Sequence, residues 1–445
     1  SILDSTVNAG GAVLVTATDT SQITADNAAV SASVSGSGSA AISLAVAISL
    51  AENSIGGATL ATIGNSSVDA GGSVSVLALA STSILATAAA VGVSVAGSGA
   101  FSLSGAGAGA QASNTTTNTV EASIRDGSDV TSGGAVNVSA SDTSSISSTL
   151  VSVSVSAAIS GTAAVSVAIA VTLAENAIGG TTVATIDGSA VHANGGAVNV
   201  SALGDNTITA TSVSAAISIS GSGAVAFGGA GTGAVATNTT TSSVRAIIVS
   251  STVDAIGDVT LLARNLSNIE AALVSAAVSV TASGAVAAGV AIAITEATNS
   301  IGGSTIARIE ASDVDTPGEV SVTALAGTTI DALGVAVALA VGGSGGVSVS
   351  GAGTGVIASN TTTNTIEASI TGGSDVDAGG DVALSATDQS VIDATLVAAS
   401  VAASGSGGAA INVSIAVSTA ENIFGTVTRA AIEGSGVTST GGGVS

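Results

Sequence analysis

The 445-residue sequence contains no cysteine, methionine, tryptophan, tyrosine or lysine, and it has one proline, one histidine and three phenylalanines. Without cysteine, a disulfide framework and a thiolate zinc site are both excluded. Five arginines stand against 29 acidic residues, so the clustered cations that bind nucleic acid are missing. A disordered acidic chain is excluded as well, because 46% of the residues are apolar. The composition predicts a folded, acidic protein with no nucleic-acid partner.

Long apolar runs are also missing. One of the longest, from Leu333 to Val341, is about half of a membrane-spanning helix, so we expect no membrane insertion. No basic segment precedes an apolar run, so neither a signal peptide nor an anchor is predicted. The sequence starts and stops in the middle of its own repeat, and we therefore expect it to be part of a longer assembly.

The sequence repeats itself every 61 or 62 residues, in two alternating types of half-unit. The register is marked by an asparagine that follows Ala-Glu or stands in Asn-Thr-Thr-Thr in most copies. The register asparagines are Asn53, Asn114, Asn176, Asn238, Asn299, Asn360 and Asn422. Such register without insertions predicts that residues 1–445 form a single continuous array of about seven half-units, with no separate domains.

Within a half-unit, apolar and small residues alternate with period two, as in Ile42–Ile48 and Ser73–Leu79. This alternation and the many β-branched residues predict strands, which glycine-rich turns separate. The only proline, Pro317, falls in one of these turns. We predict an all-β fold, a β-solenoid (β-helix) with long strand-turn-strand arms. The sequence leaves open whether each half-unit is one large coil with an arm or three coils of about 20 residues.

One column pattern distinguishes the two types of half-unit. Nine, seven and five residues before the register asparagine, the first type carries bulky residues such as Leu44, Val46 and Ile48. The second type carries Gly105, Gly107, Gly109, Gly229, Gly231, Gly233, Gly351, Gly353 and Gly355 at these positions. We expect bulky and glycine rows to pack together inside the chain, with Phe101 and Phe227 as further core residues. In the alternative, the glycines let another copy approach laterally.

The register asparagines carry a prediction of their own. A side-chain amide both donates and accepts hydrogen bonds, so identical amides one layer apart can bond to one another. We predict an asparagine ladder, or at least seven equivalent turn asparagines bonded to backbone.

The segment Ser374–Asp388, which recurs at residues 128–140 and 67–78, resembles the coil motif of filamentous-haemagglutinin-type β-helices and giant bacterial surface adhesins. The resemblance covers about a third of the chain and excludes the Ala/Gly/Ser-rich hairpin. It implies a right-handed parallel β-helix, secretion, and work outside the cell in adhesion or surface structure.

Residues for catalysis are scarce. His192 stands beside a glycine turn and is expected to be a turn residue. The arginines are scattered, and Arg245 is the nearest candidate for a break in the repeat, because Glu121 and Glu367 occupy its position in sister units. A Ser/His/Asp arrangement needs a unique, non-repeating site. We predict no enzyme activity and no organic cofactor.

Two binding chemistries remain open. Asp126, Asp129, Asp375 and Asp377 are weak calcium candidates in glycine-rich turns, although turn aspartates commonly bond to their own backbone. The threonines of Thr115–Thr117, Thr239–Thr241 and Thr361–Thr363 are expected in a turn, with an ice-binding hydroxyl array as a remote alternative.

Together these features predict an extracellular or cell-surface structural protein, a segment of a filament, a fibre or a giant adhesin stalk. Its expected partner is itself, end to end and laterally. The alternative is a glycan- or calcium-binding adhesive module that presents an acidic, threonine-rich edge.

Overall fold

The computed structural model describes all residues 1–445 and contains 31 β-strands and no helix. Each half-unit forms one coil of four strands, of four, seven, sixteen and twenty-five residues in the complete coils. The strands of successive coils pair in parallel, and the register advances by one half-unit at each step. The β-solenoid prediction is confirmed, and each half-unit is one large coil with an arm rather than three small coils.

The strands form four sheets, which we name A to D. Sheet A contains β1 (Ile2–Leu3), β5 (Ala40–Gly64), β9 (Phe101–Arg125), β13 (Ala163–Asp187), β17 (Val225–Val249), β21 (Val286–Glu310), β25 (Val347–Thr371), β29 (Ala409–Phe424) and β30 (Val427–Ile432). Sheet B contains β2 (Thr6–Ala9), β6 (Ser67–Ala70), β10 (Asp129–Ser132), β14 (Ala190–Ala193), β18 (Thr252–Ala255), β22 (Asp313–Thr316), β26 (Asp375–Ala378) and β31 (Gly436–Ser439). Sheet C contains β3 (Val13–Asp19), β7 (Val74–Ala80), β11 (Val136–Asp142), β15 (Val198–Gly204), β19 (Val259–Asn265), β23 (Val320–Ala326) and β27 (Val382–Asp388). Sheet D contains β4 (Gln22–Ser37), β8 (Ser83–Ser98), β12 (Ser145–Ser160), β16 (Thr207–Ser222), β20 (Asn268–Ser283), β24 (Thr329–Ser344) and β28 (Val391–Ser406).

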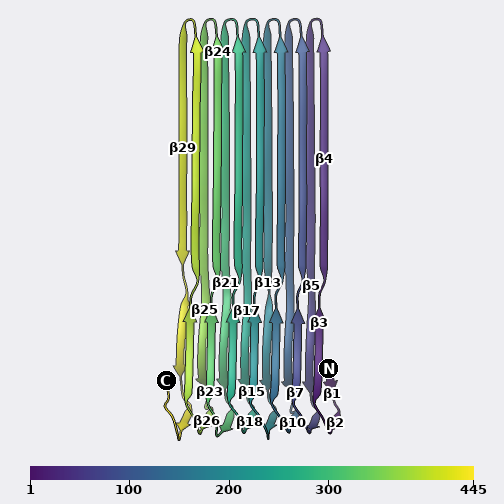
Figure 1. Cartoon of the computed structure of the whole chain (residues 1–445), viewed down its shortest axis with the longest axis vertical. Helices are drawn as coiled ribbons and strands as arrows, with labels where there is room; N and C mark the ends of the chain where they lie inside the picture. The colour runs from purple at the N-terminus through teal and green to yellow at the C-terminus, as the bar shows by residue number, and fades with distance from the viewer.

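Figure 1 shows two parts of the molecule. The long strands of sheets D and A run side by side to a row of tight turns, while the short strands lie together at the other end, near both termini. We call the two-layered part, sheet D with the facing part of sheet A, the arm. We call the part enclosed by sheets B and C and the rest of sheet A the three-sided core. In the view of Figure 1 the strands of the arm run nearly straight and side by side.

The three-sided core is a hydrophobic rod built from columns of similar residues. One column on sheet A is made of isoleucine in six successive coils: Ile63, Ile124, Ile186, Ile248, Ile309 and Ile370, all fully buried. β-Branched residues pack well on a pleated surface, and parallel strands in register place each one over its equivalent in the next coil. The three-sided core therefore repeats the same kinds of side chain from one coil to the next.

One corner of every coil, between sheets A and B, requires left-handed backbone. The residues with positive φ there are Asp4, Asn65, Asp126, Gly127, Gly188, Ser250, Ala311, Gly372, Gly373 and Gly434. Asn, Asp and Gly tolerate this conformation best, which explains why they prevail at the corner. The recurrence of Asp and Gly here is thus a backbone requirement.

Candidate functional site: the arm and its outer faces

An unbroken asparagine ladder crosses all seven coils at the base of the arm. Each register asparagine donates from Nδ2 to Oδ1 of the next one, at 2.8–2.9 Å, in six successive hydrogen bonds. Asn238 and Asn360 are fully buried. The ladder prediction is confirmed, but all seven asparagines lie within strands, and six of them, with the neighbouring threonines, lie well inside 25-residue strands. Their expected placement in a turn is wrong, because these strands run through the position without interruption.

Between the arm and the three-sided core lies a band of buried polar residues, which we call the neck. Asn118 donates from Nδ2 to the hydroxyls of Thr82 (3.0 Å) and Ser144 (2.9 Å). Ser144 in turn donates to Oδ1 of Asp142 at 2.5 Å, and its backbone N–H donates to Oδ1 of Asn206 in the next coil. The repeat did not reveal the neck, because the polar residue comes from sheet A in one coil and from sheet C in the next.

Asp142 predicts a pH-dependent stability. Burial raises the pKa of this carboxyl above 3.8, although hydrogen bonds from Ser144 and Asn118 oppose the rise. Because the folded pKa exceeds the unfolded one, the carboxylate destabilises the fold above the folded pKa, and this penalty disappears as the pH falls through it. In an equivalent coil, Asn265 accepts the same hydrogen bond, from Ser267 at 2.7 Å.

Because a neutral amide avoids the desolvation that raises the pKa of the carboxyl, we expect Asp142→Asn to raise the free energy of unfolding at pH 7, by about 1 kcal/mol as is common for a stabilising substitution. The gain should vanish below pH 3.8. Urea unfolding of the wild type and the variant at pH 3 and pH 7 measures it. A gain that is equal at both pH values would contradict the explanation.

The interior of the arm consists mainly of small side chains, with a few buried leucines such as Leu150 and Leu273. Alanine and serine of sheet D face alanine and serine of sheet A, and the two sheets approach so closely that a Cβ on Gly92 would lie 2.3 Å from the carbonyl oxygen of Gly107. Many of the interior hydroxyls have no hydrogen-bond partner: among them are Ser152, Ser212, Ser279, Ser348 and Ser350. A buried hydroxyl without a partner lowers stability. The arm interior thus contributes less stabilisation than the three-sided core.

The bulky and glycine rows lie on the outer face of sheet A, so their expected interior position is wrong. Ile169 and Ile292, in central coils, are 51% and 46% exposed. A Cβ added to Gly231 or Gly353 would meet no atom within 4 Å, so packing within the chain does not require these glycines. The bulky rows point outward because most of the gap between the two sheets is too narrow for large side chains, as the clash of a Cβ on Gly92 with Gly107 shows.

Phe101 and Phe227 lie on the same outer face and are 39% and 46% exposed. Their predicted role as core residues is therefore also wrong. They belong to glycine-bearing strands but stand nearer the tip of the arm than the glycines do.

The calcium candidates are dispersed over the corner and sheet B. Asp126 is a left-handed corner residue that pairs with Arg125, with Nε and Oδ2 3.5 Å apart. Asp375 and Asp377 face outward on β26, next to Asp313 and Asp315 of the preceding coil. No group of three or more His, Asp or Glu residues lies close enough together to hold a metal ion.

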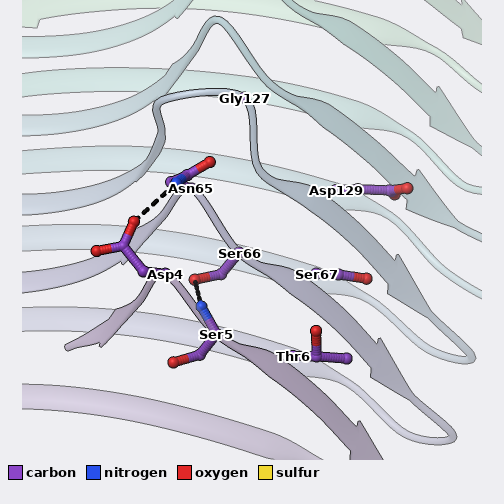
Figure 2. A pocket seen from close by; sticks show the side chains of 8 residues that line it. All are labelled: Asp4, Ser5, Thr6, Asn65, Ser66, Ser67, Gly127 and Asp129. Atoms are coloured by element: carbon purple, nitrogen blue, oxygen red, sulfur yellow. Dashed lines mark hydrogen bonds between the residues drawn. The ribbon is translucent and has the colours of Figure 1, made fainter.

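Figure 2 shows the corner of the first three coils, where Asp129 and Asp4 lie on opposite sides of an open polar hollow. Asn65 donates to Oδ1 of Asp4 at 2.7 Å, and the Ser5 N–H donates to the hydroxyl of Ser66 at 3.1 Å. Both contacts link one coil to the next. The hollow is thus a surface of the repeated corner, where side chains hold successive coils together.

His192 lies in strand β14 and not in a turn as expected, and its Nδ1 is 2.7 Å from Oδ2 of Asp254 in the next coil. Arg245 stands between Val183 and Ile306 and makes no ion pair. Arg308 instead binds Glu367 at 2.9 Å. Burial would raise the pKa of Glu367, but hydrogen bonds from Ser369 and Arg308, with the Arg308 charge, lower it overall.

Comparisons with protein-family models, with curated proteins and with solved structures find no match to this chain. The structure contains no helix long and apolar enough to cross a membrane. The segment Leu333–Val341 lies within strand β24.

Proposed function

We propose that the chain is a segment of an extracellular structural protein that builds a filament or a fibre, with no catalytic role. The observation that carries the proposal is the asparagine ladder, which links all seven register positions without a break. A ladder of identical residues gives each coil the same bonds to its neighbours, so coils add along one axis without a change in geometry. Such additive stacking is the property that a load-bearing filament needs.

The shape of a coil favours a broad filament over a thin stalk. Each coil uses 61 or 62 residues to advance by about 4.8 Å, the spacing of neighbouring strands. Its longest strands have 25 residues, which extend over about 80 Å at about 3.3 Å per residue. Seven coils thus form a slab about 34 Å deep and more than twice as wide. One chain therefore adds more to the width of a filament than to its length, as expected for a thick fibre.

The coil motif supports an extracellular location. Residues Ser374–Asp388, which resemble the filamentous-haemagglutinin type of coil, form β26, β27 and the turn between them. Proteins with such coils are secreted and act at bacterial surfaces, and we extend that location to this chain. The outer strands β28 and β29 each pair with one neighbour, and further coils can add end to end at this edge.

Electron microscopy of negatively stained native material tests the proposal. We expect filaments outside the cell, decorated by an antibody against the chain, with a flat cross-section about 80 Å wide in its long direction. Antibody labelling confined to the cell interior, or to isolated globular particles, would contradict it. Binding of labelled polysaccharide at one unique position would instead favour the adhesive alternative.

A further inference from the structure

The outer face of the arm on sheet A is exposed, yet it is apolar and carries no charged residue. Five successive outward positions on each of seven strands, β5 to β29, carry only apolar residues or glycine. On β13 these are Ala163, Val165, Val167, Ile169 and Val171. On β17 they are Val225, Phe227, Gly229, Gly231 and Gly233. The chain has a net charge of −24, yet none of its charged residues lies in this area, which we call the ridged face.

The ridged face is corrugated with a period of two coils. Over three of the five outward positions, strands β5, β13, β21 and β29 bear the bulky rows and form ridges, and strands β9, β17 and β25 bear the glycine rows and form grooves between them. At the two positions nearest the tip, the glycine-bearing strands carry bulky residues such as Phe101 and Phe227. Because neighbouring strands are about 4.8 Å apart, ridges recur about every 9.6 Å, and so do grooves. The strands of the arm run straight, so each ridge and groove is straight as well.

We propose that the ridged face binds the ridged face of a second copy of this chain, with the ridges of one copy seated in the glycine grooves of the other. The ridge and groove periods are equal, so a displacement by one coil places every ridge opposite a groove. A glycine row lets a facing side chain approach the backbone closely. This inference goes beyond the proposed function, since a stiff filament segment needs no lateral partner.

Symmetry fixes the arrangement of the two copies. A two-fold axis parallel to the strands, midway between a ridge and a groove, reverses the coil order and brings ridges onto grooves at the same column. A two-fold axis along the solenoid places ridge on ridge and is excluded. The closed dimer therefore has antiparallel solenoid axes, in an isologous contact that uses the same patch twice.

The area and the composition of the face agree with a stable dimer. Five outward positions span about 30 Å along a strand and seven strands span about 34 Å, so the face covers about 1,000 Å² per copy. A stable interface needs about 800 Å² per partner. An uncharged contact also lets two copies of the same acidic chain meet without opposing carboxylates. The mostly small-residue interior of the arm leaves many bulky apolar side chains outside, and a second copy covers those on sheet A.

Filling the grooves tests the proposal. In the variant Gly231→Val with Gly353→Val, no atom lies within 4 Å of the added Cβ positions, so the fold of one copy should be unaffected. The matched control is Gly221→Val with Gly343→Val, two glycines with equally free Cβ positions on the outer face of sheet D in the same coils. Sedimentation velocity from about 1 to 100 µM measures the association of each protein.

We expect the wild type and the control to dimerise, and the groove-filled variant to have a dimer dissociation constant at least ten-fold higher. Thermal unfolding at low concentration should show all three folded alike. The proposal is wrong if the wild type is monomeric at 100 µM. It is also wrong if the groove-filled variant associates like the wild type, which would place the contact at the coil ends or on the outer face of sheet D. Equally, binding of the wild type to phosphatidylcholine vesicles that is abolished by groove filling would assign the face to a lipid surface.

Discussion

Asn238→Asp should destabilise the protein at pH 7 by about 3–5 kcal/mol, the range for an uncompensated buried charge. Asn238 is fully buried, accepts from Asn176 and donates to Oδ1 of Asn299 at 2.9 Å. An aspartate keeps the size and the acceptor but places a carboxylate oxygen against the Asn299 oxygen. Burial raises the pKa of such a carboxyl, and only its protonated form can donate to Asn299. The loss should therefore shrink as the pH falls through that raised pKa.

Asn199→Asp is the matched control. Asn199 donates to Oδ1 of Asn137 at 2.9 Å on the outer face of sheet C, where both residues are half-exposed. Solvent screens a charge there, so we expect a loss of less than about 1 kcal/mol. Urea unfolding at pH 4 and pH 7 compares the two variants. If Asn238→Asp is as stable as Asn199→Asp at pH 7, the ladder is not the internal bond that we describe.

Gly303→Ala should be the most damaging of the glycine substitutions in the neck. Gly303 has φ +136° and lies beside Ser242 of the preceding coil, and an added Cβ would sit 2.0 Å from the Ser242 carbonyl oxygen. A backbone oxygen in a continuous sheet cannot move aside as a flexible side chain can. We expect a loss of about 2–4 kcal/mol, from backbone strain together with displacement of the two coils.

Gly302→Ala is the control, one residue away. Its nearest obstacle is the Thr363 hydroxyl at 3.2 Å, the end of a side chain, and its φ is unremarkable for strand. We expect a change within about 1 kcal/mol. Hydrogen exchange at the amides of β17 and β21 localises the effect. Equal exchange in both variants would show that the coils can pack closely at the neck without a glycine at position 303.

The sequence was sufficient to predict the coils, their period and the asparagine ladder. The regular spacing of the asparagines from Asn53 to Asn422 indicates which residues of successive parallel strands lie side by side. It also led us to expect strands at Ile42–Ile48 and Ser73–Leu79, where β5 and β7 lie. These features depend only on the period of the repeat and the spacing of its residues, and both can be read from the sequence.

The direction in which the arm strands face was not predictable by the usual preference for bulky apolar residues inside. Alternation at Leu44, Val46 and Ile48 defines two faces, and both are apolar or small. The useful signal is that small residues match small residues across the hairpin at most positions, as in Ala88 and Ala110, because two sheets approach closely where both present small residues. The neck was hidden for a different reason: Asp142 has alanine and glycine as its neighbours in register.

Single-molecule force extension of the whole chain, held at its two ends, tests most directly the claim that identical coils carry load along one axis. We expect a ladder of similar force peaks, each releasing one coil of 61 or 62 residues, which adds about 200–220 Å of contour length at 3.3–3.6 Å per residue. Extension without peaks, or increments unrelated to one coil, would contradict the account.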